Sequence, residues 1–154
     1  MPLEAVHLRI ASHEAAHAVA TAMLGYRPLW ATRDPDLVRG SHVRGEVVAD
    51  FLSQASSPQQ AAADLAVSKM TAVVIEPGGM GIVADADVAS THDIGKLLGE
   101  DPDEFVHRSA GRAKELINSA TFRRAHSELE WRLVSELTVF GDEIWAVVQR
   151  SAGP

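Results

Sequence analysis

The segment from residue 4 to residue 24 constrains the fold more than any other part of the chain, because it predicts one long helix. Its apolar residues and two histidines follow one another at alternating spacings of four and three, which places them on one stripe of an α-helix. Gly25 follows the segment and is typical of a helix C-terminus. We expect this stripe to face the core. It consists of Val6, Ile10, His13, His17, Ala20 and Leu24.

The two histidines of the stripe, His13 and His17, are spaced so that both imidazoles can reach one metal ion. Residues four apart are separated by about 40° around the helix axis and lie about 6 Å apart at Cβ. Glu14 projects about 100° from His13, so it would flank such a metal without binding it, as suits a general base acting on water. The sequence "HEAAH" fulfils the H-E-x-x-H pattern, in which two histidines bind zinc.

The alternative is that these are core histidines of an alanine-rich helix that binds no metal. Burying two imidazoles without a common partner would leave several hydrogen bonds unmade, so we favour the metal site. A metzincin would need glycine and histidine at the positions of Ala20 and Met23. The third ligand must therefore come from a distant part of the chain.

Composition limits the chemistry of such a site. The chain has 154 residues, no cysteine and a net charge of −7. Without cysteine, a metal must be held by histidine, carboxylate or water. The negative charge argues against nucleic acid as the main partner. We find neither a signal-peptide pattern nor an apolar run of about 20 residues, and we therefore expect a cytoplasmic protein without a membrane segment in this chain.

The remaining pattern predicts a single domain over residues 1–154 that is mainly α, with a small β element. Short apolar runs between Pro, Gly and Asp residues predict strands near 28–33 and 43–49, paired as a hairpin. We expect the glycine-rich stretch "EPGGMGIVADADVAS" to form a loop, and a helix to restart behind Ser90 or Thr91. Further helices are predicted over residues 57–76, 103–118 and 122–137, and a last one after the segment "TVFGDEI", running to about Arg150.

Asp93 is a candidate carboxylate ligand downstream of the histidine pair. With Ser90 as the N-cap, Asp93 would be the third residue of a helix, where a carboxylate can complete a capping box, and its position alone favours that structural role. Asp85 and Asp87 are alternative ligands or partners of a ligating imidazole, although the pattern favours solvated loop charges at both positions. His92 is a further candidate, which could line a cleft beside Asp93.

The chain resembles the zinc peptidase domain of the FtsH family of ATP-dependent membrane proteases. The segments "HEAAHAV", "ASTHDIG", "AKELI" and "TVFGDEI" match the family's motifs in the same order and at similar spacing. Ala16 stands where the family has glycine, and His92 where asparagine is common. The resemblance implies a zincin-like helical domain with a small β-hairpin, in which His13, His17 and Asp93 bind zinc and Glu14 is the catalytic base. We expect the ATPase module and membrane segments of the family to be absent from this chain.

The function implied is that of a zinc metalloendopeptidase that cleaves unfolded or flexible polypeptides. A separate ATPase or a second copy of the chain is a candidate partner. The alternative, from another class, is a non-catalytic zinc-binding or peptide-binding module that retains the motif as a structural site. Glu14 argues against this alternative, because a structural site does not need a base.

Overall fold

The computed structural model describes residues 3–34, 51–75 and 82–153, and within these ranges the chain is mainly helical, as predicted. The N-terminal helix predicted over residues 4–24 is confirmed, and so are the helices near residues 57–76, 103–118 and 122–137. The last helix is also present, but it begins at Gly141, within the segment after which it was predicted to start. None of the described helices is long and apolar enough to cross a membrane. The elements are α1 (Leu3–Met23), β1 (Trp30–Thr32), α4 (Pro58–Ile75), α5 (Ile82–Leu97), α6 (Pro102–Asn118), α7 (Ala120–Ser135), β2 (Thr138–Phe140) and α8 (Gly141–Ser151).

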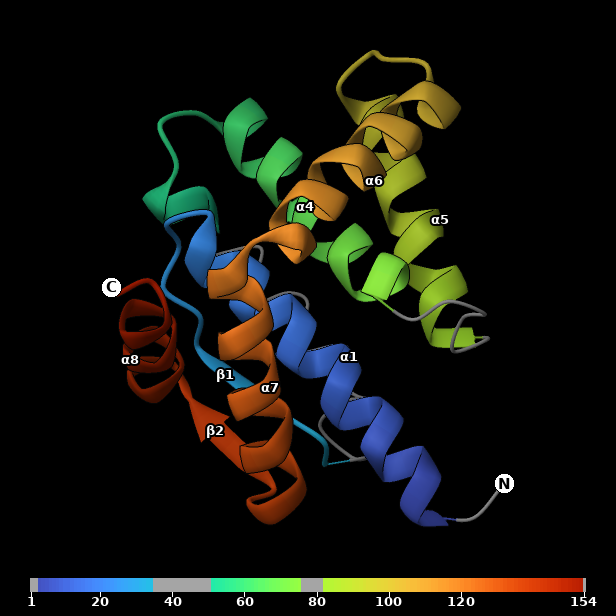
Figure 1. The fold of residues 1–154 in the computed structure, drawn as a ribbon. Helices are drawn as coiled ribbons and strands as arrows, with labels where there is room; N and C mark the ends of the chain where they lie inside the picture. Colours follow the sequence, from blue (N-terminus) through green and yellow to red (C-terminus); the bar gives the residue numbers. More distant parts are fainter. Residues whose placement is uncertain (1–2, 35–50, 76–81, 154) are drawn as a thin grey trace.

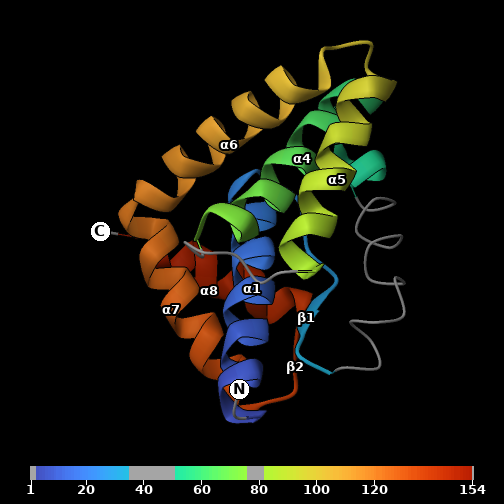
Figure 2. The same cartoon turned by 90° about the vertical axis from the view of Figure 1, so that its right-hand side faces the viewer.

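Helix α1 runs through the middle of the molecule and touches both halves of the fold (Figure 1). On one side it packs against α7, β1 and α8, and on the other against α4, which in turn contacts α5 and α6. Figure 2 shows α6 and α7 in succession along one flank, with α4 and α5 beside α6 and α1 beside α7. This arrangement places the histidine helix at the junction of two helical layers.

Small residues let the neighbouring helices approach α1 closely. Ala11, Ala15, Ala16 and Ala20 are 0% exposed, although they lie at several angles around the helix. Alanines buried on several faces of one helix indicate that its neighbours surround it there, and such packing contributes far more to helix stability than intrinsic propensity does. The burial of Ala16 also shows that the methyl group at this position fits the packing.

Strand β1 lies within the range predicted for a strand at 28–33, but its partner in the described part of the chain was not predicted. β1 pairs antiparallel with β2, with Ala31 opposite Val139. The strand predicted at 43–49, and with it the hairpin, lies outside the described residues. The observed pairing joins the segment after α1 to the segment before α8 (Figure 1). Ala31 of β1 and Val139 of β2 both belong to the hydrophobic core.

Helix α5 begins at Ile82, and the prediction of a helix start at Ser90 or Thr91 is therefore wrong. Residues 82–90, which were predicted as loop, form the first turns of the helix. Asp85 lies in the first turn, where a carboxylate complements the helix dipole, and this explains why acidic residues here are compatible with a helix. Because the helix starts earlier than predicted, the side chains that it directs toward α1 also differ from those predicted.

Gly141 allows the close approach of two backbone segments at the start of α8. Its N–H donates to the carbonyl of Leu29 at 2.8 Å, and a Cβ at this position would lie 1.8 Å from the carbonyl oxygen of Pro28. Only glycine fits at position 141, because the backbone after β2 passes so close to the backbone before β1.

Gly141→Ala is expected to lower the free energy of unfolding by about 1–3 kcal/mol, because the backbone must move to make room for the methyl group. The matched control is Gly111→Ala on α6, where an added Cβ meets nothing within 4 Å. Alanine in that helix interior should instead raise stability by about 0.5–1 kcal/mol. Urea unfolding of both variants measures the difference, and equal stability of the two would contradict the packing described.

Candidate metal centre

The predicted histidine pair lies side by side on α1 with both rings turned to the same point. The Nε2 atoms of His13 and His17 are 3.1 Å apart, and the ring centroids are 4.7 Å apart. His13 is 2% exposed, whereas the side chain of His17 is 23% exposed. One histidine is thus fixed in the core, and the other faces the edge of the site.

Asp87 on α5 completes a compact triangle with these two nitrogens. Its Oδ2 atom lies 3.0 Å from His13 Nε2 and 3.2 Å from His17 Nε2. Ligand atoms that bind a tetrahedral zinc at about 2.0–2.1 Å are about 3.3–3.4 Å apart, so the three atoms are spaced nearly as a metal would require. Together His13, His17 and Asp87 can hold a metal ion.

The carbonyl of Ser68 on α4 fixes the orientation of His17. His17 Nδ1 lies 3.0 Å from this carbonyl oxygen and donates its hydrogen to it, which leaves Nε2 available as a ligand. The hydroxyls of Thr21 and Ser68 both donate to the carbonyl of His17, at 2.7 Å and 3.2 Å. Such partners orient ligating imidazoles in metal sites, and they join α4 to α1 at this point.

His13 is held differently. Its Nδ1 atom is buried and has no hydrogen-bond partner among the residues that the structure describes. The ring is positioned instead by its Nε2 contacts with Asp87 and His17 and by the surrounding core. The Nε2 atom of His13 therefore depends on the centre of the triangle for its polar partners.

The Asp87 carboxylate and the His17 imidazole each shift the pKa of the other toward its charged form. Burial alone would raise the pKa of the Asp87 carboxyl, but the charge on His17 and hydrogen bonds from both histidines outweigh burial and lower that pKa. Burial alone would lower the pKa of His17, but the charge and hydrogen bond of Asp87, together with the charge of Glu14, raise it above 6.5. These interactions favour the ionised form of the Asp87 carboxyl and the protonated form of the His17 imidazole.

These shifts predict how metal binding depends on pH. The proton on His17 stabilises the metal-free fold fully below pH 6.5 and is lost as the pH rises through the raised pKa, whereas a metal needs the neutral imidazole. Zinc affinity should therefore fall by about tenfold per pH unit as the pH is lowered through that range, because one proton competes with the metal. Chelator competition titrations between about pH 5 and about pH 8 measure this dependence, and an affinity independent of pH would contradict it.

Glu14 is half-buried and lies next to the metal group without belonging to it. Its charge contributes to the raised pKa of His17, after the larger effects of burial and Asp87. Its role as a base beside a metal remains a prediction.

The structure does not bring Asp93 to the two histidines, in contrast to the prediction of Asp93 as the third ligand. Asp93 is exposed on α5, six residues after Asp87 and therefore about 240° further around the helix. Asp85 is also exposed, and His92 pairs with Asp103, with 3.5 Å between Nε2 and Oδ1. Asp87, which was predicted only as an alternative, is the carboxylate that faces α1.

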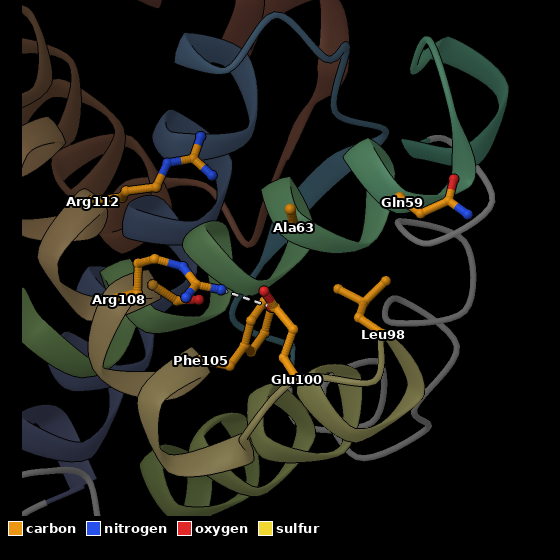
Figure 3. Close-up of a pocket in the computed structure, with 8 residues that line it drawn as sticks. Gln59, Ala63, Leu98, Glu100, Phe105, Arg108 and Arg112 are labelled. Carbon is orange, nitrogen blue, oxygen red and sulfur yellow. Dashed lines mark hydrogen bonds and ion pairs between the residues drawn. The ribbon is translucent and has the colours of Figure 1, made fainter.

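A separate cavity of about 290 Å³ lies between α4, α6 and the corner before α6, and it shares no residue with the metal group (Figure 3). Arg108 Nη2 lies 2.7 Å from Glu100 Oε2, and Arg112 Nη2 lies 3.2 Å from Asp64 Oδ1. The hydroxyl of Tyr26 also donates to Asp64, at 2.5 Å. We assign these charges to the packing of α6 against its neighbours.

Comparison with known proteins assigns neither a family nor a function to the chain. No family model matches the chain, and no curated protein and no solved structure matches it significantly. The function must therefore be argued from the geometry of the site.

Proposed function

We propose that this protein is a zinc-dependent metallopeptidase with an FtsH-like peptidase domain. The observation that carries the proposal is the triangle of His13, His17 and Asp87, with Glu14 beside it on the same helix. Two imidazoles and one carboxylate are a ligand set of catalytic zinc, which uses three protein ligands and leaves one position open. His17, at 23% exposed, is the member of the group whose side chain reaches the surface of the described structure.

The residues of the site then have distinct roles. A zinc ion bound there would polarise the scissile carbonyl and lower the pKa of a bound water to about 7. Glu14 takes a proton from the attacking water and returns it to the leaving amine. Ser68 holds His17 through its backbone carbonyl, so that the ring keeps one orientation during turnover.

The resemblance to the FtsH family supports the proposal through the "HEAAH" segment, and it needs one change. In this chain the third ligand is assigned to Asp87 instead of Asp93, because Asp87 is the carboxylate that joins both histidines in one potential metal group among the residues that the structure describes. We infer that the substrates are unfolded or flexible polypeptides, in keeping with the family's peptidase domains.

The proposal is tested by peptide cleavage with and without metal. The zinc-loaded protein should cleave a denatured protein such as casein or members of a peptide library, lose this activity with a chelator, and regain it when zinc is added back. His17→Ala should show neither activity nor zinc retention, and it controls for contaminating proteases.

The same experiment decides between the two candidate classes. A protein that binds one zinc tightly and cleaves none of these substrates would support a non-catalytic zinc-binding or peptide-binding module. Because two histidines and one carboxylate also hold iron(II) in oxygenases, the metal content of the purified protein is measured together with activity.

A further inference from the structure

Lys69 on α4 is a buried lysine that lies against the metal group. It is 7% exposed, and its Nζ atom lies 3.8 Å from Asp87 Oδ1. The other oxygen of the same carboxylate, Oδ2, faces His13 and His17. The two oxygens of Asp87 thus have different partners, a cation on one side and the two imidazoles on the other.

The sequence around Lys69 makes this position unusual. Lys69 is the one charged residue in the segment "LAVSKMTAVVI" of α4, and Val67, Met70 and Ala72 on the same helix are buried in the core. Lysine is almost never fully buried unless it is paired, because the desolvation of an ammonium group costs several kcal/mol. A polar or apolar residue of similar length would fill the space without that cost, so packing alone does not explain a lysine here.

We propose that Lys69 is a positioning residue of the metal centre, which binds Oδ1 of Asp87 so that the carboxylate offers only Oδ2 to the metal. The inference rests on the proposed zinc site. Asp87 is on α5 and both histidines are on α1, and Lys69 on α4 contacts the carboxylate from a third helix. The 3.8 Å separation is that of an ion pair without a hydrogen bond, so Lys69 acts by electrostatic attraction, which favours the orientation of the carboxylate in which Oδ1 faces the ammonium group.

This arrangement has a consequence for coordination. A carboxylate that binds through one oxygen gives, with two imidazole nitrogens, the three protein ligands of a catalytic zinc site and leaves the fourth position open. A carboxylate free to bind through both oxygens would occupy that position. Lys69 would thus keep room for water and the substrate carbonyl without touching either of them.

A simpler view of Lys69 makes the opposite prediction. If Lys69 were only a positive charge near the metal, its removal would relieve repulsion and tighten zinc binding. If it positions Asp87, its removal should weaken zinc binding by about 10–100-fold, as is typical for partners of ligating groups. The sign of the change distinguishes the two roles.

The test compares Lys69→Met, which keeps the length of the side chain but removes its charge, with Lys69→Arg, which keeps the charge. Lys96→Met, at an exposed position on α5, is the control for the loss of one positive charge. Zinc affinity is measured by competition with a chromophoric chelator, and the visible absorption of the cobalt(II) form reports coordination number. Circular dichroism checks folding, and Lys69→Gln replaces Lys69→Met if that variant does not fold.

We expect weaker zinc binding and a weaker cobalt absorption band, typical of a higher coordination number, in Lys69→Met, with both near wild type in Lys69→Arg and Lys96→Met. Unchanged or tighter zinc binding in Lys69→Met, or equal losses in the Met and Arg variants, would overturn the positioning role while leaving the zinc site intact. Failure of the wild type to bind either metal would overturn the proposed function and this inference together.

Discussion

Glu14→Gln is expected to retain zinc and to lower peptide hydrolysis by at least about 100-fold, the usual minimum for loss of a general base. Glutamine keeps the shape of the side chain but cannot accept the proton of the attacking water. Zinc should remain bound because Glu14 lies outside the group of His13, His17 and Asp87. The two quantities, kcat/KM for a peptide and zinc content, are measured on the same preparation.

A matched variant excludes a general effect of lost negative charge. Glu130→Gln on α7 removes one carboxylate outside the metal group and should leave both activity and zinc content unchanged. If Glu14→Gln hydrolyses peptides as fast as the wild type, Glu14 is not the base. Loss of zinc from Glu14→Gln would instead show that this carboxylate supports the metal, and the role assigned to it would be wrong.

Asp87→Asn is expected to weaken zinc binding by more than about 100-fold, which exceeds the loss typical for residues that only orient a ligand. Asparagine leaves a neutral oxygen in place of the charged Oδ2 atom that lies 3.0 Å from His13 and 3.2 Å from His17. Peptide hydrolysis should fall with zinc occupancy. Because the change also leaves Lys69 beside a neutral amide, urea unfolding of the metal-free variant must show that the fold persists.

Asp93→Asn is the control from the same helix. Asp93 is exposed and about 240° around α5 from Asp87, so zinc affinity should be unchanged in this variant. The opposite result, with zinc lost from Asp93→Asn and kept by Asp87→Asn, would restore Asp93 as the ligand and contradict the structure at this point.

Much of the helical fold could be predicted because its local signals are strong. Alternating three- and four-residue spacing identified α1, and Ser119, which caps α7 by accepting from the N–H of Phe122, marks a boundary close to the predicted one. The start of α5 was missed because glycines and aspartates before Ser90 are typical of loops. The pairing of β1 with β2 joins residues about a hundred positions apart, and no local pattern indicates such a contact.

The part of the candidate site that lies on α1 could be predicted from the sequence, because a single helix determines it. His13, Glu14 and His17 owe their relative positions to helix geometry alone, whereas Asp87 depends on where α5 begins and how it packs. An error of eight residues in a helix start changes which carboxylate faces α1. Ser68 and Lys69 were not predicted, although a serine and a lysine in the largely apolar second half of α4 are a signal that could have identified them.

The most direct test of the zinc centre is X-ray absorption spectroscopy at the zinc edge on the purified wild-type protein, together with its metal content. We expect about one zinc per chain, with two imidazole nitrogens at about 2.0–2.1 Å and the remaining ligands oxygen, one from Asp87 and one from solvent. His17→Ala should lose this signal. A protein that retains no zinc after reconstitution, or whose zinc spectrum is unchanged in His17→Ala, would contradict the metal centre described above.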